Sequence, residues 1–140
     1  MSRHIFHLAF PVNDLETSCT FYTEGLGGSV GRRNSAWLDI LIWGHQITLH
    51  QRPAEVPASG AHGVRHFGAV LPWAEWEQTI RSLETKGVPL ASKPLVSFPG
   101  TPEEQGKFYV EDPSGNGIEL KAYRSFNAVF GVKKEESSTV

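Results

Sequence analysis

The stretch that decides the fold is residues 106–121, which read GKFYVEDPSGNGIELK. The run DPSGNG at residues 112–117 is dense in turn-forming residues, so it predicts a hairpin between the two segments that flank it. Apolar and polar side chains alternate in both segments, as in strands with one buried face. The apolar face comprises Phe108, Val110, Ile118, Leu120 and Ala122, and the other face comprises Tyr109, Glu119 and Lys121. The carboxylate of Glu119, between two aliphatic residues in mid-strand, must face water, a cation or a metal ion.

Composition narrows the class of protein. The chain has 140 residues and a net charge of −2, a length that fits one modest domain or two closely joined half-domains. The weak negative charge argues against nucleic acid and anionic membranes as partners. No segment is apolar enough to span a bilayer and the N-terminus lacks a signal-peptide core, so we expect a cytoplasmic protein. Cys19 is the only cysteine, which excludes an internal disulfide and a cysteine-based zinc site.

The same order of elements is predicted twice along the chain. In the first half, a strand at residues 5–12 precedes a helix whose start has Asn13 as N-cap and Glu16 three residues later. In the second half, a strand at residues 64–71 precedes a helix that Pro72 opens and Lys86-Gly87 closes. Three further strands follow each helix, at residues 29–33, 36–43 and 46–51 and then at residues 90–98, 106–111 and 117–123.

This repeat predicts the fold and the division of the chain. We expect an α+β protein in which two βαβββ modules form curled mixed sheets with the helices on the convex side. The expected boundaries are residues 1–51 for the first module, 52–63 for a linker, 64–124 for the second module and 125–140 for a tail with a disordered end. Five side chains then lie on the concave side, namely those of His7, His50, His66, Tyr109 and Glu119.

His7, His66 and Glu119 form a candidate metal-binding set. The two histidines occupy equivalent positions in the repeat, on the face away from the core. Two imidazoles and one carboxylate suit a borderline divalent cation, and three protein ligands leave coordination positions open for a substrate. A single histidine in mid-strand is more often structural than a metal ligand. Two histidines at equivalent positions favour the ligand role instead. Gly68 leaves space beside a ligand near His66, or it marks a bulge.

These motifs resemble the vicinal oxygen chelate superfamily, which includes glyoxalase I, extradiol dioxygenases, and fosfomycin and bleomycin resistance proteins. The resemblance rests on HLAFPV before Asn13-Asp14-Leu15, on His66-Phe67-Gly68 and on the 112–116 turn followed by Glu119, and it extends to Tyr123. Within the superfamily the chain is most similar to small proteins described as predicted extradiol-type dioxygenases. The resemblance places metal ligands at His7, His66 and Glu119.

The resemblance also implies roles for His50 and Tyr109. It implies an acid–base group at His50, where glyoxalase I-like members have a glutamate ligand, and a hydrogen-bonding tyrosine at Tyr109. His50 could instead be a fourth ligand or a polar wall residue, and Tyr109 could simply fill the barrel. The implied cofactor is one divalent metal ion per chain, with Fe(II) favoured and Zn, Mn or Ni as alternatives.

Three functions follow from the resemblance. The first is an extradiol-like dioxygenase that acts on a small catechol-like or other vicinal-oxygen substrate. The second is a glyoxalase I-like isomerase or lyase, or a thiol transferase. The third is a metal-free binding protein, which the His/His/Glu set disfavours. Many extradiol enzymes carry two pairs of modules, and this chain has one. We also expect a homodimer, because Phe126, Val129 and Phe130 form an apolar tail with no place in the repeat.

Overall fold

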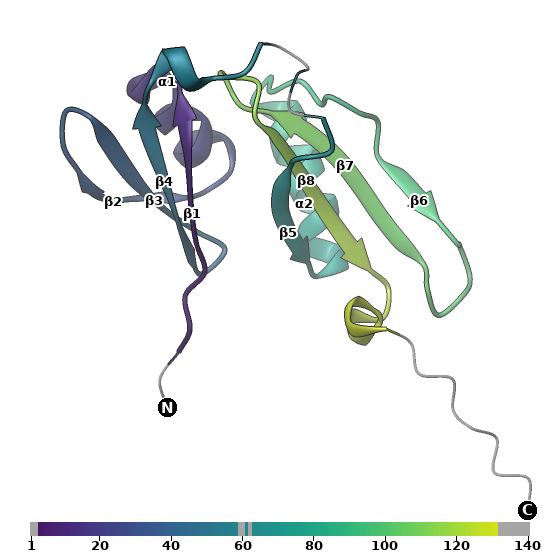
Figure 1. Cartoon of the computed structure of the whole chain (residues 1–140). Coiled ribbons are helices and arrows are strands. Elements are labelled where there is room, and N and C mark those ends of the chain that lie inside the picture. Colours follow the sequence, from purple (N-terminus) through teal and green to yellow (C-terminus); the bar gives the residue numbers. More distant parts are fainter. Residues whose placement is uncertain (1–2, 59–60, 62, 132–140) are drawn as a thin grey trace, which may run out of the picture.

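The computed structural model describes residues 3–58, 61 and 63–131 and shows two four-stranded mixed sheets (Figure 1). The first half comprises β1 (His7–Val12), α1 (Leu15–Thr20), a π-helical turn (Phe21–Gly25), β2 (Ser29–Arg33), β3 (Trp37–Ile42) and β4 (His45–Gln51). The second half comprises β5 (Phe67–Leu71), α2 (Trp73–Thr85), β6 (Leu95–Ser97), β7 (Gln105–Glu111) and β8 (Gly117–Tyr123). Two 3-10 helices, Pro53–Glu55 and Phe126–Phe130, complete the order.

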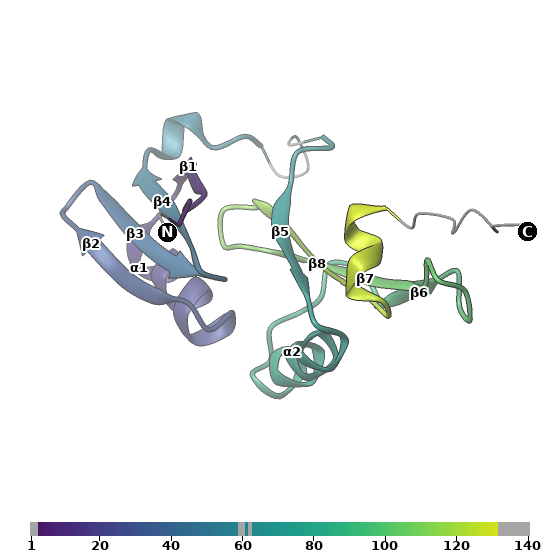
Figure 2. The same ribbon diagram turned by 90° about the horizontal axis from the view of Figure 1, so that it is seen from below.

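Both sheets have the same topology. Their strand orders are β1-β4-β3-β2 and β5-β8-β7-β6, and the first strand of each module pairs in parallel with its last strand. The other pairs are antiparallel. The helix α1 contacts β3 and β4, and α2 contacts β8, so each sheet has its helix on one face (Figure 2). The predicted α+β architecture of two βαβββ modules is confirmed.

The α1 helix begins one residue later than the sequence suggested. Asp14 is the N-cap, and its carboxylate accepts a hydrogen bond from the Thr17 backbone N–H at 2.8 Å. The predicted N-cap Asn13 is wrong, because Asn13 precedes the N-cap; its backbone N–H donates to the Ser114 hydroxyl at 2.9 Å. That contact ties the start of α1 to the turn between β7 and β8.

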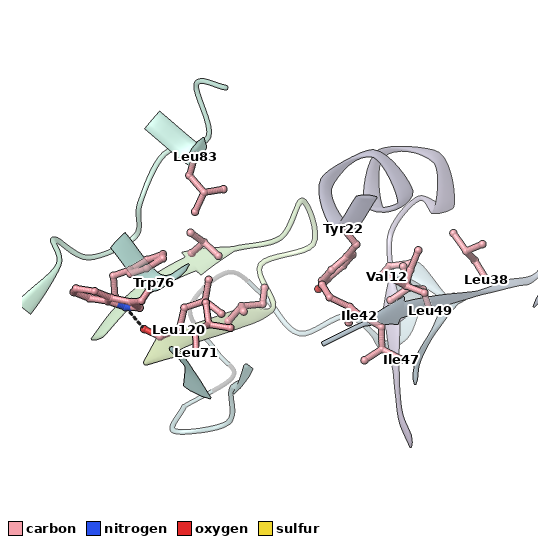
Figure 3. Packing of buried hydrophobic residues seen from close by; sticks show 14 of the residues in the cluster. Val12, Tyr22, Leu38, Ile42, Ile47, Leu49, Leu71, Trp76, Leu83 and Leu120 are labelled. Atoms are coloured by element: carbon pink, nitrogen blue, oxygen red, sulfur yellow. Dashed lines mark hydrogen bonds between the residues drawn. The ribbon is translucent and has the colours of Figure 1, made fainter. Parts of the chain in front are cut away.

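Trp76 anchors α2 on the second sheet. It is buried, and its indole N–H donates to the Leu120 carbonyl at 2.9 Å (Figure 3). Gly106 on β7 makes room for this ring, since a Cβ atom there would lie 2.6 Å from the indole. Leu83 is also fully buried, which agrees with the predicted helical spacing of the apolar face.

The hairpin predicted at residues 112–117 joins β7 and β8. Val110 pairs with Ile118, and Phe108 pairs with Leu120. Gly115 in the turn has φ +81°, a left-handed conformation that glycine adopts without strain. The apolar face of the hairpin is buried: Phe108, Val110, Ile118, Leu120 and Ala122 are at most 1% exposed.

The turn of this hairpin also joins the two modules. Asp112 is buried, and its carboxylate accepts hydrogen bonds from the Tyr22 hydroxyl at 2.8 Å and from two backbone N–H groups of the turn at 2.9 Å. The amide of Asn116 donates to the same carboxylate at 2.9 Å. The rings of Phe10 and Phe67 pack 5.1 Å apart at the same junction. The Asp-Pro turn therefore holds the first helix against the second sheet.

Four strands are shorter than predicted, and β3, which covers Trp37–Ile42 instead of residues 36–43, is the least changed. β1 begins at His7 instead of residue 5, and β5 begins at Phe67 instead of residue 64. The pairing of β1 with β4 starts at His7 and Gln46, and that of β5 with β8 starts at Phe67 and Ile118, although the Phe6 carbonyl still accepts from the Gln46 N–H at 3.0 Å. The strand predicted over residues 90–98 covers only Leu95–Ser97, because Pro94 lacks the N–H that a ladder requires.

The tail forms a 3-10 helix with exposed apolar side chains. Phe126 is 50% exposed and Phe130 is 84% exposed. The predicted disordered end concerns residues 132–140, which lie outside the described residues. None of the helices in the described ranges is long and apolar enough to cross a membrane.

Candidate metal centre

The second sheet brings together three of the predicted site residues. The His66 Nε2 atom lies 2.7 Å from Glu119 Oε2, and the rings of His66 and Tyr109 pack edge to face with centroids 5.3 Å apart. Tyr109 and Glu119 are direct partners across β7 and β8. All three side chains lie on the face opposite the buried apolar residues of the hairpin, as their alternation predicts.

Local backbone geometry fixes the orientation of the His66–Glu119 pair. The His66 Nδ1 atom lies 2.6 Å from the Val64 carbonyl, which can only accept a hydrogen bond, so Nδ1 carries a proton and Nε2 faces Glu119. Glu119 pairs with Gly68 on its other side, and a Cβ atom on Gly68 would lie 1.7 Å from the Glu119 carbonyl oxygen. Gly68 therefore allows β5 to approach β8 beside Glu119.

Tyr109 is a hydrogen-bond donor in this cluster. Desolvation first, and then the hydrogen bond to Glu119 and the charge of that carboxylate, raise the pKa of the Tyr109 hydroxyl above its usual value. A tyrosine hydroxyl is ordinarily protonated at neutral pH, and this shift favours the protonated form further. It can donate a proton or a hydrogen bond beside the carboxylate.

The first sheet holds His7 and His50 on the corresponding face. His7 pairs with Gln46, and its Nδ1 atom lies 2.8 Å from Gln46 Oε1. His50 lies four residues further along β4, beside Pro11 of β1, at a separation of about 13 Å from Gln46 for the usual rise of a strand. That separation argues against His50 and His7 binding the same metal ion.

A single chain does not bring His7 to His66 and Glu119. The Phe10 ring packs on Phe67, so the start of β5 lies near the end of β1, and the two strands point in opposite directions (Figure 1). His7 is three residues before Phe10, about 10 Å back along β1. Consistent with this, no group of three or more His, Cys, Asp or Glu side chains within the described ranges is close enough to hold a metal ion.

Sequence reasoning did not assign Asp39, Gln46 and Thr48 to the site. Asp39 is fully buried on the His7 face, where its carboxylate accepts from Thr48 Oγ1 at 2.7 Å, Arg32 Nε at 2.9 Å and Gln46 Nε2 at 3.4 Å. A signal for this cluster was present in the sequence. Asp39 interrupts an aliphatic strand between Leu38 and Ile40, as Glu119 does in the second module.

The donor set fits a divalent metal ion. His66 Nε2 and Glu119 Oε2 lie 2.7 Å apart, and His7 uses its Nδ1 atom in the hydrogen bond with Gln46. Imidazole nitrogens and one carboxylate oxygen suit Fe(II), Zn(II), Mn(II) or Ni(II). The second sheet holds two of the three predicted donors, and the first sheet holds the third.

Comparisons with known proteins agree with the fold. The sequence-family model of the Glyoxalase/Bleomycin resistance protein/Dioxygenase superfamily matches residues 4–120 of this chain. Metallothiol transferase FosB of Staphylococcus epidermidis is 29% identical over 117 residues, which cover 81% of this chain and 78% of that protein. A glyoxalase/bleomycin resistance protein/dioxygenase from Alicyclobacillus acidocaldarius superposes with a TM-score of 0.77 at 28% identity, covering 86% of this chain and 91% of the other. The fosfomycin resistance protein FosX of Listeria monocytogenes shares the fold, with a TM-score of 0.69 at 17% identity over 87% of this chain and 94% of the other.

Proposed function

Because the chain belongs to the Glyoxalase/Bleomycin resistance protein/Dioxygenase superfamily, we propose that it is a metal-dependent enzyme whose site is shared between two copies. His66 and Glu119 of one copy and His7 of the other would hold one divalent ion. The observation that carries this proposal is the 2.7 Å approach of His66 to Glu119, with His7 at the equivalent place on the other sheet. When bound, such an ion polarises two neighbouring oxygens of a small substrate.

The arrangement of the modules supports a shared site. β1 and β5 are edge strands of their sheets, so each could face the other strand in a second copy. A two-fold axis would make two equivalent contacts of this kind, as is usual for homodimers. The apolar side chains of Phe126 and Phe130 supply further surface that a second copy would bury. The proposed state of the protein is a cytoplasmic homodimer that binds a small molecule.

The first candidate reaction is extradiol-type ring cleavage with Fe(II). Two side chains support it. Tyr109 places a hydroxyl beside Glu119, and His50 faces the same side of its sheet as His7. In this reaction Tyr109 would donate a hydrogen bond to a substrate oxygen, and His50 would accept and return the proton of a catechol hydroxyl.

The second candidate reaction is thiol transfer, which the similarity to metallothiol transferase FosB favours. A thiolate would attack an electrophilic carbon, forming a carbon–sulfur bond as the carbon–oxygen bond breaks. The proton lost by the thiol would end on the released oxygen. Tyr109 and His50 are the groups that could donate that proton.

Paired assays on one preparation separate these reactions. The protein is purified anaerobically, stripped with a chelator and reloaded with Fe(II), Mn(II), Zn(II) or Ni(II). Oxygen uptake with a panel of catechols reports ring cleavage, and loss of free thiol with small epoxides reports thiol transfer. The proposal expects one activity that depends on added metal and disappears in His66→Ala. Activity that survives both the chelator and His66→Ala would overturn it.

A further inference from the structure

A chain of hydrogen bonds connects Arg32 to His7 across the first sheet. The Asp39 carboxylate accepts from Arg32 Nε at 2.9 Å and from Gln46 Nε2 at 3.4 Å, and Gln46 Oε1 lies 2.8 Å from His7 Nδ1. The Thr48 hydroxyl donates to the other oxygen of Asp39 at 2.7 Å. These residues come from β1, β3 and β4 and from Arg32 in β2, so the chain of bonds spans the whole sheet.

The chemistry of the donors and acceptors fixes the direction of every bond. An ionised carboxylate only accepts, so Gln46 must turn its NH₂ group toward Asp39 and its carbonyl toward His7. A carbonyl also only accepts, so His7 Nδ1 must carry a proton. In the neutral imidazole, the lone pair is then left on Nε2. Full burial of Asp39 and its bonds to Arg32 and Thr48 keep the carboxylate in place.

We propose that Asp39, acting through the Gln46 amide, is a positioning residue that locks His7 in the tautomer whose free lone pair is on Nε2. The Nδ1 atom of His66 likewise lies against a carbonyl, that of Val64 at 2.6 Å, and its Nε2 atom faces Glu119. Both histidines therefore present Nε2, one through a side-chain relay and the other through the backbone. The consequence for metal binding rests on the proposed function, whereas the tautomer does not.

Matched variants of Asp39 and Gln46 test the relay. Asp39→Leu removes the acceptor of the Gln46 NH₂ group, and Gln46→Leu removes the partner of His7. Both variants should therefore allow His7 to adopt either neutral tautomer. Asp39→Asn is the control. Its carbonyl oxygen can accept from Arg32 and Gln46, and its NH₂ can donate to the Thr48 hydroxyl, so the tautomer should be retained.

The measurement is the imidazole nitrogen spectrum of the metal-free full chain, recorded at about pH 8, where histidine side chains are ordinarily neutral. Long-range proton–nitrogen correlations distinguish the two tautomers, and the signals that vanish in His7→Gln belong to His7. We expect Nδ1–H at His7 in the parent and in Asp39→Asn, and a tautomer mixture in Asp39→Leu and Gln46→Leu. His66 should be unchanged throughout. An Nε2–H tautomer in the parent, or an unchanged His7 in Gln46→Leu, overturns the proposal.

Metal titration is the second measurement, and it separates this proposal from the metal site. Loss of an outer hydrogen-bond partner typically costs about 10- to 100-fold in metal affinity, so Gln46→Leu should bind metal that much more weakly and Asp39→Asn should bind as the parent does. Gln46 is only half-buried, so Gln46→Leu should fold even if Asp39→Leu does not. A tautomer change without any metal binding by the parent would uphold the relay and refute the proposed function.

Discussion

The bond between Tyr22 and Asp112 gives a stability prediction that does not depend on the metal. Tyr22→Phe removes one donor from a buried carboxylate and keeps the ring that packs against Phe10 and Phe67. Three other hydrogen bonds to Asp112 remain, so the carboxylate is not left without partners. The loss is therefore that of one hydrogen bond to a charged group, about 1.5–3 kcal/mol of unfolding free energy.

Urea unfolding and thermal melting at one fixed protein concentration measure this loss. At about 4 °C per kcal/mol for a chain of this size, Tm should fall by about 6–12 °C. Tyr123→Phe is the matched control, because no hydrogen bond to the Tyr123 hydroxyl is present in the described residues. Its unfolding free energy should stay within about 0.5 kcal/mol of that of the parent.

The same pair of proteins should respond differently to alkaline pH. Burial first, and then the charge of Asp112 and its hydrogen bond, raise the pKa of Tyr22 well above its usual 10.0. A group with a raised folded pKa stabilises the fold below its unfolded pKa, and this stability is lost as pH rises toward the folded pKa. The difference between the parent and Tyr22→Phe should therefore narrow above about pH 10. Equal stability at neutral pH, or a difference that grows above pH 10, would refute this account of the junction.

Three further predictions concern the site and the assembly. Glu119→Gln should lose metal measured by elemental analysis of the purified protein, because the carboxylate is the anionic ligand; retention of parental metal content would show that the site is misplaced. His50→Gln should keep its metal and lose about 10²- to 10⁴-fold in turnover if His50 transfers protons. Weaker metal binding that excess metal repairs would make it a ligand instead. Light scattering at micromolar concentration should give a dimer, and Phe130→Ser should shift the equilibrium toward monomer; a monomeric parent would contradict both expectations.

The periodic spacing of apolar residues along the sequence predicted most of the fold. Alternation in residues 106–121 predicted the faces of β7 and β8, and the turn residues predicted their hairpin. The ends of the strands were harder to predict, because they depend on where a partner strand begins. His66 is the clearest case. The sequence placed it within a strand, yet pairing with β8 begins one residue later, at Phe67 opposite Ile118.

The sequence predicted which residues belong to the site, but not which of them one chain brings together. The alternation of apolar and polar side chains along the strands was enough to put His66, Tyr109 and Glu119 on one face. The structure brings those three side chains together. The separation of His7 depends on how the modules pack at Phe10 and Phe67, which no local pattern encodes. The relay through Gln46 was missed for a similar reason, because a glutamine near a strand end has no local feature that links it to a histidine 39 residues away.

Mixing two inactive variants tests the shared site most directly. His7→Gln and Glu119→Gln are each expected to bind no metal. They are unfolded together and refolded in equal amounts, so that mixed dimers form. In a mixed dimer, His7 of the Glu119→Gln chain joins His66 and Glu119 of the His7→Gln chain, which restores one of the two sites. Metal content and activity that recover on mixing, but not when either variant is refolded alone, are the predicted result. No recovery in mixed dimers that are verified by mass would contradict a site shared between two copies.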